Sequence, residues 1–163
     1  MRLAQFNQLS AAQAQAVLAP CVAIGRWQQA LVAARPYASA QALYQQARLL
    51  AAAWGDEDFM QALAAHPRIG ERASGEEQEA ALSRREQAAV GDAVDLQQAL
   101  RVANRDYEQR FGYLFLIRAR GRSGQEMLAE LRRRLTNRPD REREEALAQL
   151  REITLLRLEE CIQ

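Results

Sequence analysis

The single histidine of the sequence, His66, is the first candidate for chemistry. It lies in the stretch AAHPRIGERAS, residues 64 to 74, at the end of an apolar run and directly before Pro67. An imidazole titrates near neutral pH and can shuttle protons, and a helix end followed by a loop is where a side chain can meet a ligand. The alternative is structural, because a protonated histidine at a helix C-terminus complements the helix dipole. The spacing alone leaves both interpretations open.

The stretch SRREQ, residues 83 to 87, is the second candidate. On a helix, Ser83, Glu86 and Gln87 share one face because they are three and four residues apart. A hydroxyl, a carboxylate and an amide on one patch can hold a small polar molecule and orient an imidazole. Ser-x-x-Glu is also the pattern of a helix capping box, and the pattern alone favours that structural interpretation.

Arg157 is the third candidate, because it interrupts the apolar residues of ITLLRLEE. A guanidinium that faces a core needs an acceptor, and a substrate carboxylate or Glu86 would serve. The alternative is an arginine whose stem passes the leucines and whose charge reaches water. The cluster at residues 132 to 134 is interpreted differently, as a solvated helix face that Glu130 and the acidic residues after it neutralise.

Composition excludes several classes of enzyme. The chain has 163 residues, 48% of them hydrophobic, and a net charge of +1. All 22 basic residues are arginines, so mechanisms that need a lysine amine are excluded: Schiff-base enzymes, lysine-bound pyridoxal enzymes and lysine-bearing phosphate loops. The balanced charge gives no reason to expect nucleic acid or an anionic membrane as partner.

Metal sites and targeting segments are not expected either. One histidine and two distant cysteines, Cys21 and Cys161, lack the close ligand pairs of a structural zinc site. The sequence shows no secretory signal pattern, no apolar run of about 18 residues and no organelle address at its end. We therefore expect a cytoplasmic protein without a metal.

Apolar spacing and capping residues predict helices along most of the chain. Ser10, Ser39, Asp56 and Asp140 are the expected helix starts, and Ser123 with Glu126 forms a capping box. The expected helices are 11–19, 26–34, 39–54, 57–65, 75–90, 92–111, 125–137 and 142–161.

One segment departs from this helical pattern. Residues 111 to 117 are an aromatic and aliphatic run of strand-like composition, which predicts a short extended segment near 111–119, buried between helices. No internal repeat and no linker divides the chain. The sequence therefore predicts an all-α fold, a compact helical bundle that forms a single domain over residues 1–163.

Four stretches together resemble one family, the 2-oxo-4-hydroxy-4-carboxy-5-ureidoimidazoline (OHCU) decarboxylases of urate breakdown. They are AAHPRIGE, LSRREQAAV, NRDYEQRFGYLFLIRARGRS and RLTNRPDREREEALAQLREITLLRL, supported by the region of Cys21 and Trp27 and by RPY at 35–37. The resemblance covers nearly the whole chain, and its His-Pro, Ser-x-x-Glu-Gln and Phe-Gly motifs come in the family's order. Tyr113-Leu114 departs from it, because many relatives have Phe-Pro there.

The resemblance implies a cofactor-free carboxy-lyase, usually a homodimer, that converts the small molecule OHCU to (S)-allantoin. In that family scheme His66 is the acid/base and Glu86 pairs with it. The substrate-binding residues that the resemblance implies are Pro67, Ser83, Arg84, Arg85, Glu86, Gln87, Phe115, Leu116, Ile117, Arg118, Ala119 and Arg157. The segment from Phe115 to Ala119 would offer main-chain groups to the ureido and ring amides.

Two other classes of function remain open from the residues alone. A non-enzymatic helical module would bind a ureide or a partner helix in the same pocket without turnover. An RNA-binding helical domain would use the arginine clusters, and its affinity would fall steeply with salt. The balanced charge disfavours the second class.

Overall fold

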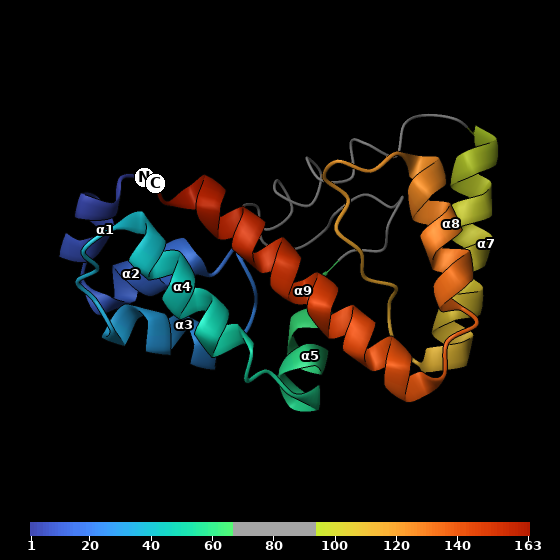
Figure 1. The fold of residues 1–163 in the computed structure, drawn as a ribbon, viewed down its shortest axis with the longest axis horizontal. Coiled ribbons are helices and arrows are strands. Elements are labelled where there is room, and N and C mark those ends of the chain that lie inside the picture. Colours follow the sequence, from blue (N-terminus) through green and yellow to red (C-terminus); the bar gives the residue numbers. More distant parts are fainter. Residues whose placement is uncertain (67–93) are drawn as a thin grey trace. The chain divides into compact units, whose positions relative to one another are not determined.

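A computed structural model of the chain describes residues 1–66 and 94–163 (Figure 1). Within these two ranges the chain forms eight helices and no β-strand, which confirms the predicted all-α fold class. The helices are α1 (Leu3–Gln8), α2 (Ala11–Leu18), α3 (Gly25–Ala33), α4 (Ala40–Ala51), α5 (Asp56–Leu63), α7 (Val94–Phe111), α8 (Gly124–Arg134) and α9 (Pro139–Cys161). In neither range is a helix both long and apolar enough to cross a membrane.

The three serines predicted to begin helices do so. Ser10, Ser39 and Ser123 precede α2, α4 and α8, and each hydroxyl accepts a hydrogen bond of 3.1 Å from the main-chain N–H three residues later. Such a bond satisfies an N–H that the first turn of a helix leaves unpaired, and each contributes about 1 kcal/mol. These caps fix where the helices start.

Several helix boundaries differ from the prediction: α4 ends at Ala51 and α8 at Arg134, each three residues early, and α9 begins at Pro139 and not at Asp140. Asp56 was the predicted cap of α5, but it is the first helical residue, and the carboxylate of Asp58 accepts a hydrogen bond of 3.0 Å from the N–H of Gly55 instead. The same helix ends at Leu63, two residues earlier than predicted. Helix α1 was not predicted at all, because its six residues contain mostly short or polar side chains.

The chain divides into two compact units. The first comprises Met1–Ala62 and Arg151–Gln163, and the second comprises Leu63–Leu150. Helix α9 therefore contributes its first half to the second unit and its second half to the first. The two chain ends lie side by side in the first unit (Figure 1), where the ammonium group of Met1 donates to the carbonyl of Cys161 at 2.9 Å.

The RPY motif secures the first helix of the first unit. The guanidinium of Arg35 donates to the carbonyls of Phe6 at 2.6 Å and Leu9 at 2.9 Å. The Asn7 amide both donates to and accepts from the main chain of Tyr37, each bond being 2.9 Å long. The motif is thus accounted for by packing of the N-terminal segment.

The second unit holds the predicted extended segment. Helices α7 and α8 lie side by side (Figure 1), and residues 112–123 connect them. Phe111 is still helical, so the extended segment begins later than predicted; Gly112, with φ +82°, ends α7. Residues 114 to 119 form no helix or strand, and most of them are buried. Their buried, non-helical character confirms the prediction.

Candidate functional site

His66 lies three residues beyond the end of α5 at Leu63, whereas the sequence predicted it as the last helical residue or the first one after the helix. Its main-chain N–H donates to the carbonyl of Leu63, the last residue of α5, at 3.1 Å. The side chain is half-buried, and its Nε2 atom is shielded from solvent. The imidazole is thus partly accessible, while the main chain of His66 closes the turn that follows α5.

Six other residues that the resemblance assigns to the site lie outside the described residues. These are Pro67, Ser83, Arg84, Arg85, Glu86 and Gln87. The expected helix at 75–90 and the turn near Gly91 also fall there. The pairing of Glu86 with His66 therefore stays a prediction.

The predicted substrate-binding segment, Phe115 to Ala119, belongs to the second unit, as His66 does. Four of its five residues are at most 5% exposed, so its main chain lies inside the protein. Two of its main-chain groups already hold a side chain: the Leu116 carbonyl accepts from Arg134 Nη1 at 2.8 Å, and the Arg118 N–H donates to Gln149 Oε1 at 2.8 Å. These bonds anchor the segment to α8 and α9.

The other main-chain groups of this segment form fewer hydrogen bonds. The Ala119 carbonyl accepts from the N–H of Arg122 at 3.1 Å, which closes a turn. By contrast, the main chains of Phe115 and Ile117 form no hydrogen bond with any residue in the described ranges. Buried N–H and C=O groups nearly always have a partner.

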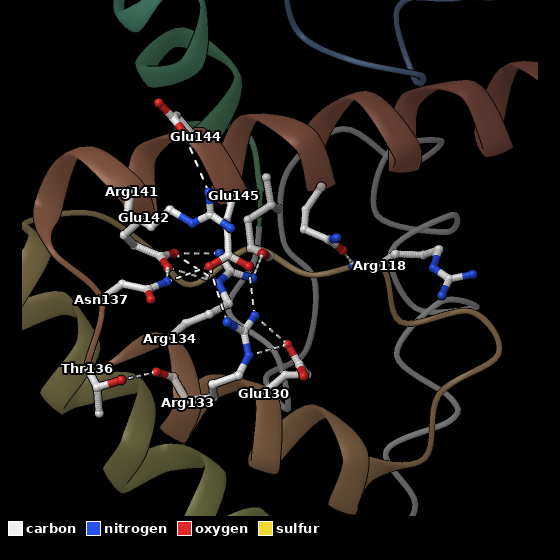
Figure 2. A network of polar contacts seen from close by, with 12 residues as sticks. Arg118, Glu130, Arg133, Arg134, Thr136, Asn137, Arg141, Glu142, Glu144 and Glu145 are labelled. Carbon is white, nitrogen blue, oxygen red and sulfur yellow. Dashed lines mark hydrogen bonds and ion pairs between the residues drawn. The ribbon is translucent and has the colours of Figure 1, made fainter.

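A buried ion pair, not predicted from the sequence, supports the segment. The guanidinium of Arg134 binds the carboxylate of Glu142 through Nε at 3.1 and 3.0 Å and through Nη2 at 2.5 Å. The two side chains are only 2% and 0% exposed. The pair and its neighbours form a polar network between α8 and the start of α9 (Figure 2). Because both side chains are buried, water does not screen the attraction between Arg134 and Glu142.

Tyr107 of α7 completes this network. Its hydroxyl donates to the Glu142 carboxylate, and its ring packs edge-on to the Phe115 ring, with 5.2 Å between the ring centroids. Burial, followed by the bond to Glu142, holds the pKa of the Tyr107 phenol far above its usual value. The phenol therefore keeps its proton at neutral pH and donates a hydrogen bond to Glu142.

The predicted solvated face at residues 132–134 is wrong for Arg134. Arg132 is exposed and Arg133 is half-exposed, but Arg134 is 1% exposed. The reason is helical spacing: Met127, Leu131 and Arg134 lie four and three residues apart, on the buried face of α8. That spacing is the signal in the sequence, and the run of three consecutive arginines obscures it.

Arg157 belongs to the first unit and is completely buried there. Its Nη1 atom donates to the carbonyls of Pro20 and Cys21, at 3.4 Å each. These are long bonds, so the carbonyls satisfy the charge only weakly. The alternative in which the arginine reaches water is wrong, because the whole side chain lies inside the protein. The predicted acceptor Glu86 lies outside the described residues.

Comparison with known proteins settles the family. A family model described as OHCU decarboxylase matches residues 7–159. The chain belongs to the OHCU decarboxylase family.

Relatives of the family occur in urate breakdown. The chain is 28% identical over 164 residues to the uric acid degradation bifunctional protein of Bacillus sp. (strain TB-90), an alignment that covers 98% of this chain and 32% of that protein. It is 40% identical over 85 residues to the 2-oxo-4-hydroxy-4-carboxy-5-ureidoimidazoline decarboxylase of Amia calva, covering 50% of this chain and 48% of the relative. The chain thus spans about a third to a half of the length of these curated relatives.

A solved structure of the family has the same fold. The crystal structure of OHCU decarboxylase in the presence of (S)-allantoin superposes with a TM-score of 0.73 and 27% sequence identity. The match covers 87% of this chain and 94% of that one. The helical architecture described above is therefore the architecture of this family.

Proposed function

We propose that this protein decarboxylates OHCU to (S)-allantoin in urate catabolism, without a cofactor. The observation that carries the proposal is membership of the OHCU decarboxylase family over residues 7–159. The half-buried His66 and the buried segment at Phe115–Ala119, both in the second unit, support it. We further propose that residues 1–163 act as one domain.

The chemistry asks little of the protein beyond binding and proton transfer. OHCU carries a C=N bond next to the carbon that bears its hydroxyl and carboxylate. When the bond to the carboxylate breaks, carbon dioxide leaves and the electron pair moves into that C=N bond. The enol-like intermediate must then receive a proton on one face to give a single enantiomer. A chain without lysine can perform these steps.

In this proposal His66 handles the proton. It either takes the hydroxyl proton or delivers the proton to carbon, and Glu86 fixes its tautomer and supports its charged form. A positioned acid/base of this kind contributes about a hundredfold to ten-thousandfold to a rate. The helix-end position and shielded Nε2 of His66 support this role.

The remaining residues would bind the substrate. The main chains of Phe115 and Ile117 would meet the ureido and ring amides, since Leu116 and Arg118 already hold Arg134 and Gln149. Pro67, Ser83, Arg84, Arg85 and Gln87 keep the binding roles that the resemblance implies. Arg157 would orient the substrate or Glu86, because tight binding of the leaving carboxylate would stabilise the ground state and oppose catalysis.

Two expectations accompany this proposal. The cytoplasmic location stays a prediction from the sequence, and the homodimer stays a prediction from the resemblance. Light scattering of the purified protein checks the second one directly.

The proposal is tested by the rate at which OHCU disappears. OHCU is generated in place from urate by a urate oxidase and a hydroxyisourate hydrolase, and its absorbance is followed with and without the protein. We expect a decay rate proportional to protein concentration. Heat released by ureide binding in a calorimeter, with no faster decay, would instead support the non-enzymatic binding module.

A further inference from the structure

We propose that Arg134 is a positioning residue for this reaction, one that holds the segment Phe115–Ala119 in the geometry that binds substrate. The inference rests on the proposed function, because it assumes that this segment receives OHCU. It concerns a residue on α8 that is fully enclosed by protein, so it acts through the segment and not on the substrate.

Arg134 reaches the segment in two ways. Its Nη1 atom donates to the Leu116 carbonyl at 2.8 Å, and its guanidinium lies over the Phe115 ring, 4.5 Å from the ring centroid. The first contact fixes a main-chain atom and the second fixes the side chain next to it. A displacement of about 1 Å can cost about a hundredfold in rate when it misplaces a binding group.

The guanidinium is itself held from the opposite side. Its Nε and Nη2 atoms bind Glu142, and the same carboxylate accepts from the Tyr107 hydroxyl and from Asn137 Nδ2 at 3.1 Å. Figure 2 shows how Arg134, Asn137 and Glu142 converge at this point. Because Glu142 is 0% exposed, water does not compete for these bonds. The arginine therefore has one orientation, and its Nη1 is the atom left to hold the segment.

The neighbouring Arg133 provides a matched control. It lies in the last turn of α8, where it binds Glu145 of α9 at 2.7 Å and Glu130 of its own helix at 2.8 Å. Its contacts in the described ranges lie on the outside of the helices and do not include the segment. An effect of charge at the end of α8 would appear in both arginines, whereas an effect of the segment would appear only in Arg134.

The test compares Arg134→Lys with Arg133→Lys. Lysine keeps the charge but not the planar fork, so it cannot bind Glu142 and the Leu116 carbonyl with fixed geometry. For Arg134→Lys we expect amide hydrogen exchange in residues 113–120 to speed up at least about tenfold, while exchange in α3 and α4 stays unchanged. We expect KM for OHCU to rise at least about tenfold with kcat within about threefold, because main-chain contacts bind substrate and transition state alike.

Each outcome decides the proposal. Unchanged hydrogen exchange in residues 113–120 overturns the proposal, and so does a KM for OHCU like that of Arg133→Lys. Faster exchange throughout the protein with an unchanged KM also overturns it, because that result indicates a merely structural role for Arg134. If Arg134→Lys fails to fold, the combined variant Arg134→Met, Glu142→Leu and Tyr107→Phe removes the buried charges together and is measured in the same way. If the unaltered protein does not speed OHCU decay, the proposed function fails, and the exchange comparison still shows whether Arg134 holds the segment.

Discussion

At the scale of single residues, His66 carries the chemistry that we propose. It is the only imidazole in a chain without lysine, so the side chains that can move a proton near neutral pH are few. The main-chain N–H of His66, not its imidazole, forms the hydrogen bond to Leu63 that closes the turn. The turn therefore does not depend on the imidazole. Removing the imidazole should therefore affect turnover and not folding.

We expect His66→Ala to lower kcat at least about a hundredfold, because a positioned acid/base contributes at least that much. The measurement is the initial rate of OHCU decay, with helical content followed by far-ultraviolet circular dichroism as the control for folding. A folded variant that keeps a near-normal rate would remove His66 from the mechanism.

The two interpretations of SRREQ make opposite predictions. If Glu86 orients and supports the His66 imidazole, Glu86→Ala should lose more rate than Ser83→Ala. If the motif is only a capping box, Ser83→Ala should do the greater harm, and it should act through stability, by about 1 kcal/mol. Rates and thermal unfolding of both variants separate the two cases.

At the scale of elements, two ion pairs join α8 to the start of α9, and they differ in their exposure to solvent. The inner pair joins Arg134 to Glu142 and is buried, whereas the outer one joins Arg133 to Glu145 and is partly exposed. The hydrogen bond from Arg133 holds the pKa values of Glu145 and Glu130 below their usual value. A lowered pKa stabilises the fold only while the carboxylate is ionised.

The outer pair predicts a dependence of stability on pH. Its contribution is fully present above the usual glutamate pKa of 4.5 and is lost as the pH falls through the lower values of the folded state. Arg133→Met should therefore lower the free energy of unfolding at pH 7 by less than about 1 kcal/mol per pair, and the melting temperature should fall with it. This difference from the unaltered protein should shrink below pH 4.5.

Thermal unfolding at several pH values checks this prediction, with Arg132→Met as the control. Arg132 is exposed on the same turn, so its loss should change little at any pH. A destabilisation by Arg133→Met that is equal at neutral and acid pH would contradict the account of the outer pair.

The sequence predicted elements better than it predicted the network between them. Ser10, Ser39 and Ser123 were recognised because an N-cap is a local pattern, read from a few neighbouring residues. The bond from Arg134 to the Leu116 carbonyl joins residues 18 positions apart, and no local pattern reports it. The sequence does contain the helical spacing of Arg134 with Leu131, which indicates burial. A cluster of charged residues is more simply expected to face water, and that expectation was wrong for Arg134.

The sequence likewise predicted some features of the candidate site and left others open. The position of His66 near the end of α5 followed from the apolar run that ends before Pro67, and the extended segment followed from its composition, so both were predicted. The burial of Arg157 was left open, because an arginine among leucines fits both a core and a surface. Packing inside the first unit, which includes the carbonyls of Pro20 and Cys21, decides between them.

At the scale of the whole molecule, family membership unites these features. The match over residues 7–159 and the shared fold at a TM-score of 0.73 cover both compact units. Helix α9 belongs to both units: its first half carries Glu142 and Gln149, and its second half carries Arg157. One helix therefore bears anchors of the proposed substrate segment and the arginine that the resemblance assigns to the substrate.

The most direct test of the central claim is the chirality of the product. OHCU is generated in place from urate, and circular dichroism follows the appearance of optically active allantoin. We predict a fast rise of a signal from one enantiomer, in proportion to the protein added, because protonation in the site occurs on one face. A trace identical to the uncatalysed decay, which yields racemic allantoin, in the presence of folded protein would contradict the claim that this chain is an OHCU decarboxylase.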